Sequence, residues 1–150
     1  MWSGESWIIS SPISRRVPLL IITHFHADHV AGLSGVLQRR RIGQLWLSPL
    51  APPGPLTAMV RHQAAQEAIP VNAPLPGTRA SVGEAELQVL GPVDHVAADQ
   101  DESSQQNDSS LVIMVEVARL RLLLTGDVEP PGQQAILGTG ADLRADVLKI

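Results

Sequence analysis

The chain lacks cysteine, has few aromatic side chains and contains no long apolar run. Without cysteine there are no disulfide bonds and no thiolate metal sites, so any metal must be bound through nitrogen and oxygen. Aromatic residues make up only 3% of the 150 positions, so the core must consist mainly of Leu, Ile, Val and Ala. A hydrophobic content of 44% is ordinary for a globular protein, and this length suffices for one domain with a core.

An excess of basic residues is also missing. The formal net charge is −4, so the composition gives no support for a nucleic-acid-binding surface. The only basic run, at 39–41, is typical of a solvated helix end. No apolar stretch approaches the roughly 20 residues needed to span a bilayer, and the first residues show no signal-peptide pattern.

Apolar periodicity predicts short strands alternating with helices. Strands are expected at 7–9, 19–22, 44–48, 78–82, 86–91, 111–117, 120–125 and 145–150, with 111–117 and 120–125 paired around a tight turn. Helices are expected at about 31–41, 56–69 and 130–137, the first capped by Asp28 and the second begun by Pro55. The segments 70–77 and 92–109 are expected to be a Pro-rich connection and a polar loop.

Four potential metal ligands occur within six residues, directly after the strand expected at 19–22: His24, His26, Asp28 and His29. Side chains two apart in an extended segment point to the same side, so His24 and His26 are expected to converge on one cation. Asp28 and His29 come as the chain turns into a helix and could serve a second cation. Several ionisable groups at a strand end are costly to bury without a shared partner, which favours a metal site. Imidazole and carboxylate ligands suit zinc, with manganese or iron also possible.

Another carboxylate, Asp127, follows the apolar run at 122–124. Gly126 would allow the backbone to approach closely at this point. Asp127 is therefore expected to bridge two metals, which in such sites lie roughly 3.5–4 Å apart. Taken alone, Asp127 would be better explained as a turn or helix-cap residue, and the nearby histidine cluster is what favours a metal role. His62 and His95 are more typical of solvated side chains.

The pattern His24-x-His26-x-Asp28-His29 followed by Gly32 resembles the signature of the metallo-β-lactamase superfamily. Thr125-Gly126-Asp127 resembles the bridging-aspartate motif of that family. Together with Asn107-Asp108-Ser109-Ser110-Leu111-Val112 and Asp146-Val147-Leu148-Lys149-Ile150, the chain from about 17 to 150 looks like the C-terminal hydrolase domain of ComEC-type competence proteins. The resemblance implies an α/β protein with a four-layer αββα fold and metals at one edge of two sheets.

The resemblance also implies a function. ComEC-type proteins are membrane channels that take up single-stranded DNA, and their hydrolase domain is considered to degrade the strand that does not enter. The implied activity is that of a phosphodiesterase or nuclease linked to DNA uptake, in which a metal-bound hydroxide attacks phosphorus. The implied metal ligands, for two divalent ions with zinc favoured, are His24, His26, Asp28, His29 and Asp127. Asp28 and Asp127 would be catalytic, single-stranded DNA would be the substrate, and a parent protein would place the domain at the cell membrane.

Some features of the family pattern are missing. Residues 1–16 show no Asp-Val-Gly-Gln-Gly-Asp type segment, and the chain ends before the expected His-His-Gly-Ser type segment. A third histidine for the first metal is not evident, and only His95 and Asn107 are candidates. The chain is therefore expected to be a single partial domain over 1–150, an incomplete αββα sandwich with weak activity. Two alternatives remain: a hydrolase of small esters, thioesters or lactams, which the charge of −4 fits equally well, and a non-catalytic fragment.

Overall fold

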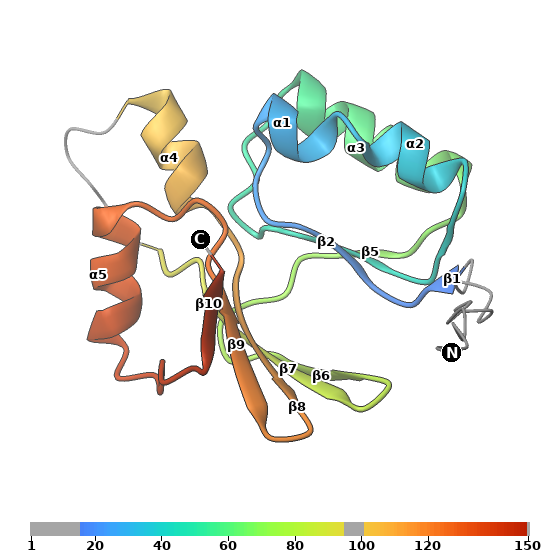
Figure 1. The fold of residues 1–150 in the computed structure, drawn as a ribbon. Helices are drawn as coiled ribbons and strands as arrows, with labels where there is room; N and C mark the ends of the chain where they lie inside the picture. The colour runs from blue at the N-terminus through green and yellow to red at the C-terminus, as the bar shows by residue number, and fades with distance from the viewer. Residues whose placement is uncertain (1–15, 95–100, 150) are drawn as a thin grey trace, which may run out of the picture.

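The computed structural model of the chain describes residues 16–94 and 101–149 (Figure 1). The strand expected at 7–9 and the candidate ligand His95 lie outside these residues. The helices are α1 (Ala27–Val30), α2 (Leu33–Leu37), α3 (Pro55–Gln66), α4 (Glu102–Asp108) and α5 (Pro130–Gly138). The strands are β1 (Arg16–Val17), β2 (Leu20–Ile22), β3 (Arg41–Ile42), β4 (Leu45–Leu47), β5 (Val71–Asn72), β6 (Arg79–Val82), β7 (Ala85–Gly91), β8 (Val112–Val117), β9 (Leu120–Leu124) and β10 (Val147–Lys149).

Most strands belong to two sheets. The larger sheet has the order β10-β9-β8-β7-β6, and the smaller one has the order β2-β4-β5 with all its strands parallel. The predicted pairing around Ala118 and Arg119 is confirmed: β8 and β9 form an antiparallel hairpin, and Ala118 adopts a positive φ of 53° in its turn. β10 adds to the edge of β9 in parallel, while β1 and β3 form a separate parallel pair.

Three apolar clusters lie between four layers. The first joins the smaller sheet to α1, α2 and α3, the second lies between the sheets, and the third joins the larger sheet to α5 (Figure 1). Alternation along a strand explains this division, because Ile113 faces the second cluster whereas Val112 and Met114 face the third. The αββα architecture implied by the sequence resemblance is therefore confirmed.

The prediction of one helix over 31–41 is wrong. The structure has two short helices, α1 and α2, and Arg41 and Ile42 instead form β3, which pairs with β1. Asp28 does not cap a helix: it lies in the first turn of α1, where its negative charge suits the helix dipole, and His26 takes the N-cap position.

Two elements lie where the sequence predicted irregular structure. α4 occupies part of the polar segment 92–109, and β5 lies within the Pro-rich connection 70–77. The side chain of Asp101 begins α4 by accepting a hydrogen bond of 2.8 Å from the Ser104 N–H. Within the described parts of the chain, no helix combines the length and hydropathy that crossing a membrane requires.

Candidate metal centre

The loop from Thr23 to His26 joins β2 to α1 at the edge where the two sheets meet (Figure 1). The Leu111 N–H, just before β8, donates a hydrogen bond of 3.0 Å to the Thr23 carbonyl. This bond ties the larger sheet to the smaller one beside the loop. Asp127 follows β9 and reaches the same edge from the larger sheet.

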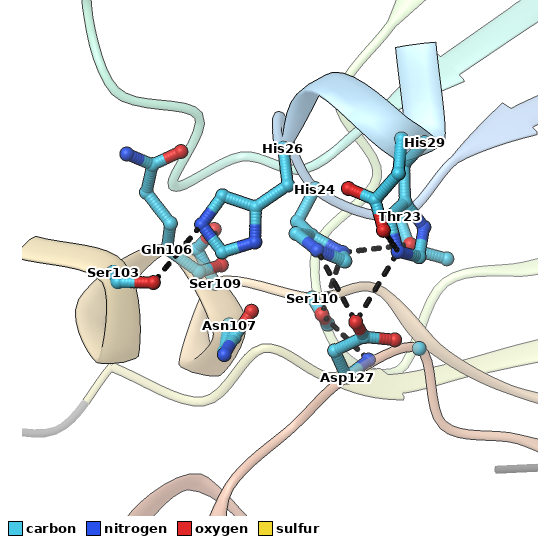
Figure 2. Close-up of polar contacts among 12 residues, drawn as sticks. Thr23, His24, His26, His29, Ser103, Gln106, Asn107, Ser109, Ser110 and Asp127 are labelled. Carbon is cyan, nitrogen blue, oxygen red and sulfur yellow. Dashed lines mark hydrogen bonds and ion pairs between the residues drawn. The ribbon is translucent and has the colours of Figure 1, made fainter. Parts of the chain in front are cut away.

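Three potential ligands meet at this point: His24, His29 and Asp127. Their ligand atoms all lie within 4.8 Å of one another. Asp127 Oδ2 is 3.2 Å from His29 Nε2 and 3.7 Å from His24 Nε2 (Figure 2). The side chains of His29 and Asp127 are 27% and 39% exposed, so solvent and substrate can reach the cluster from one side.

His24 forms the closed side of the cluster, with its side chain fully buried. Its Nδ1 lies 3.1 Å from Thr23 Oγ1 and 3.2 Å from Ser110 Oγ, whereas its buried Nε2 has no hydrogen-bond partner. Burial, followed by repulsion from His29, lowers the pKa of His24 to about 4, so the imidazole is neutral at pH 7. A neutral imidazole with an unpaired nitrogen, beside a second imidazole and a carboxylate, is a donor set that fits a divalent cation.

The expected convergence of His24 and His26 on one cation stays a prediction, but in the structure His29 lies nearer to His24 than His26 does. The rings of His24 and His29 are 4.1 Å apart, whereas His26 meets the His24 ring edge-on at 4.9 Å. The reason is local: the backbone is extended only as far as His26, and the first turn of α1 brings His29 back beside His24. His26 Nε2 instead lies 3.5 Å from Ser103 Oγ on α4.

Asp28 lies outside the group of three. Its side chain is 80% exposed, and Oδ2 is 3.6 Å from His29 Nε2. Asn107, a sequence candidate for a further ligand, donates from Nδ2 to Glu129 Oε1 at 2.7 Å. Its buried Oδ1 has no hydrogen-bond partner. Metal binding by His26, Asp28 and Asn107 stays a prediction.

Asp108 and Ser110, on the segment that leads from α4 into β8, were assigned no individual role from the sequence. The Ser110 hydroxyl accepts a hydrogen bond of 3.2 Å from the Asp127 N–H, and Asp108 Oδ1 accepts one of 2.8 Å from the Glu129 N–H. Asp108 and Ser110 thereby fix the turn that carries Asp127. Their signal in the sequence was the motif Asn107-Asp108-Ser109-Ser110 itself, in which polar residues directly precede a buried strand.

The close approach expected at Gly126 is present. Gly126 has a positive φ of 57°, and a Cβ atom built on it would lie 2.8 Å from Ser110 Cβ. Glycine thus lets the turn before Asp127 pack directly against Ser110.

Most of the chain matches the model of a known protein family. The family model described as the metallo-beta-lactamase superfamily matches residues 14–147. The chain belongs to the metallo-β-lactamase superfamily. ComE operon protein 3 of Bacillus subtilis (strain 168) is 25% identical over 136 residues, which are 91% of this chain and 17% of that protein. The chain therefore spans about a sixth of the length of this relative.

Solved structures share the superfamily fold. CmlA, a diiron β-hydroxylase from Streptomyces venezuelae, gives a TM-score of 0.58 at 17% identity, covering 97% of this chain and 27% of CmlA. The MIM-2 metallo-β-lactamase gives a TM-score of 0.54 at 22% identity, covering 88% of this chain and 53% of MIM-2. These likenesses show the fold alone, and the metallo-β-lactamase superfamily, whose model matches this chain, typically binds divalent metals.

Proposed function

We propose that this superfamily member is a metal-dependent phosphodiesterase of the nuclease type, with single-stranded DNA as its substrate in DNA uptake. The observation that carries the chemistry is the His24–His29–Asp127 cluster at the edge of the two sheets. The similarity to ComE operon protein 3 over 91% of the chain supports the substrate class. By analogy with ComEC-type proteins, the chain would act at the cell membrane as one domain of a longer, channel-forming protein.

The cluster suits hydrolysis of a phosphodiester. Divalent ions, when bound, would lower the pKa of a water molecule to about 7 and neutralise charge on the phosphate. His24, through its unpaired Nε2, and His29 would hold the metal. Asp127, whose Oδ2 lies near both imidazoles, would be the carboxylate ligand from the larger sheet, in the bridging role that the family resemblance implies. Asp28, exposed beside His29, would extend the ligand set toward solvent and accept a proton from the attacking water.

Zinc fits this nitrogen and oxygen donor set, as do manganese and iron. His26 would add a third imidazole if its ring turned away from Ser103, because it already stands edge-on against His24. Neither this donor set nor a third imidazole requires a cysteine ligand, and the chain contains no cysteine.

The test is cleavage of a single-stranded oligonucleotide and of a chromogenic phosphodiester by the purified protein reconstituted with zinc or manganese. His24→Ala and Asp127→Asn should each lower kcat/KM by at least about 100-fold, since even residues that only support metal ligands cost 10–100-fold. His62→Ala, a change at an exposed position on α3 outside the cluster, is the matched control and should retain activity. Metal-loaded protein that cleaves neither substrate would refute the proposal.

A second candidate is a hydrolase of small esters, thioesters or lactams. The observation that favours it is a mainly apolar hollow of about 620 Å³ beside Asp127, whose lining includes Leu123, Val128, Ile136 and Leu148. The basic residues Arg16 and Arg39–Arg41 line a separate hollow, whose lining includes no member of the metal cluster. Cleavage of a thioester or β-lactam, without cleavage of DNA, would support this candidate over the nuclease.

A further inference from the structure

The Ser110 hydroxyl lies between two candidate metal ligands that come from different sheets (Figure 2). His24 follows β2 of the smaller sheet, and Asp127 follows β9 of the larger one. Ser110 Oγ is 3.2 Å from His24 Nδ1 and accepts the Asp127 N–H at 3.2 Å. Ser110 and His24 are fully buried, so bulk water does not compete for these contacts.

One hydroxyl can satisfy both groups at once. An imidazole that binds a metal through Nε2 carries its hydrogen on Nδ1, and that N–H needs an acceptor. A serine oxygen has two lone pairs, so Ser110 Oγ can accept from His24 Nδ1 and from the Asp127 N–H together. Thr23 Oγ1, 3.1 Å from the same Nδ1, offers a second acceptor. Both contacts leave His24 Nε2 as the free nitrogen of the ring, in reach of Asp127.

The backbone holds Ser110 firmly in this position. Its N–H donates to the Asn107 carbonyl at 3.0 Å, and the next residue, Leu111, donates to the Thr23 carbonyl at 3.0 Å. On the opposite side, a Cβ at Gly126 would lie 2.9 Å from Ser110 Oγ, so the turn before Asp127 is already in contact with the hydroxyl.

We propose that Ser110 is a positioning residue of the metal centre. Its single hydroxyl sets the tautomer and orientation of the His24 ring and the backbone position of Asp127, so that ligands from two sheets face the same ion. The inference rests on the metal binding in the proposed function but not on the identity of the substrate.

The test compares Ser110→Ala with Ser109→Ala. Ser109 is the matched control because it is also buried, yet its hydroxyl donates to the Gln106 carbonyl at 2.6 Å and touches neither ligand. Zinc affinity, measured by competition with a chromophoric chelator, should fall by about 10-fold or more in Ser110→Ala, the usual cost of losing a partner of a metal ligand. In Ser109→Ala it should match the wild type.

A second variant tests the shared acceptor. Thr23→Val removes the other hydroxyl beside His24 Nδ1, so its effect on zinc affinity should be small alone and larger in the Ser110→Ala background. Such a non-additive pair is the signature of two residues acting on one group. Additive effects would overturn the idea that both hydroxyls serve His24.

The other possible results of these experiments also support or overturn the role of Ser110. Ser110→Ala protein that melts like Ser109→Ala without metal, and binds zinc like the wild type, would overturn the inference. If Ser110→Ala does not fold, long-range ¹H–¹⁵N spectra of zinc-loaded wild type decide: a proton on His24 Nδ1 supports the inference, and a proton on Nε2 overturns it. If the zinc-loaded wild type does not cleave DNA but Ser110→Ala binds zinc more weakly, only the nuclease proposal is refuted. A wild-type protein that binds no divalent metal would refute both.

Discussion

At the scale of single residues, Gly126 has a tightly constrained position beside the metal cluster. Its φ of 57° belongs to the left-handed region, and a Cβ there would lie 2.8 Å from Ser110 Cβ and 3.2 Å from Thr23 Cβ. We expect Gly126→Ala to lower the free energy of unfolding by roughly 2–4 kcal/mol, combining left-handed strain with overpacking. Urea denaturation of the metal-free protein measures this change.

Gly138→Ala is the control for that substitution. Gly138 is the last residue of α5, and a Cβ there would meet no atom within 4 Å. The added methyl should leave stability unchanged or raise it by about 0.4–1 kcal/mol, because alanine restricts the unfolded chain. Equal stability of the two variants would contradict the role given to Gly126.

At the scale of elements, α4 depends on its cap. The hydrogen bond from the Ser104 N–H to the side chain of Asp101 lowers the pKa of the Asp101 carboxyl below its usual value. Asp101→Ala should therefore speed amide hydrogen exchange at Ser104, whereas Asp101→Asn, also a good N-cap, should preserve protection. Because the folded pKa is lowered, the charge-dependent part of this stabilisation is present above the unfolded pKa and is lost as the pH falls through the folded pKa.

Exchange at Ser104 that is identical in wild type and Asp101→Ala at neutral pH would show that the cap is dispensable. The difference between the two proteins should shrink under acidic conditions. The outcome also bears on the candidate metal centre, because α4 carries Ser103, the neighbour of His26, and leads through Asn107 to Ser110.

The same element shows where prediction from sequence stops. α3 was predicted because its apolar residues recur with a helical period, and β8 and β9 were predicted as paired apolar strands. α4 has the sequence Glu-Ser-Ser-Gln-Gln-Asn-Asp, so no apolar face marks it, and only Asp101 as a cap and Glu102 in the first turn signal a helix. The segment 31–41 shows the opposite error: its apolar spacing fits one helix, but pairing of Arg41 and Ile42 with β1 ends helical structure early.

At the scale of the whole molecule, the candidate metal centre also has features that could not be predicted from the sequence. The sequence predicted the residue types and the strand ends that carry them, because histidines and carboxylates directly follow apolar runs. It did not predict that the His29 ring would lie nearer to His24 than the His26 ring does, because that arrangement depends on where α1 begins. It also gave no role to Ser110, since the contact with Asp127 exists only once two sheets have packed together.

The cluster joins the two sheets, so metal binding should stabilise the whole fold. An ion that binds only the folded protein adds about 2.7 kcal/mol at a concentration 100 times its Kd. For a chain of this size that should raise Tm by roughly 5–10 °C, and a chelator should reverse the rise. Calorimetry with and without zinc measures the shift. Asp127→Asn should lose most of it, because His24 and His29 then share no charged partner from the larger sheet, while His62→Ala should keep it. An equal shift in Asp127→Asn would mean that the ion binds within the histidine loop alone and does not connect the sheets.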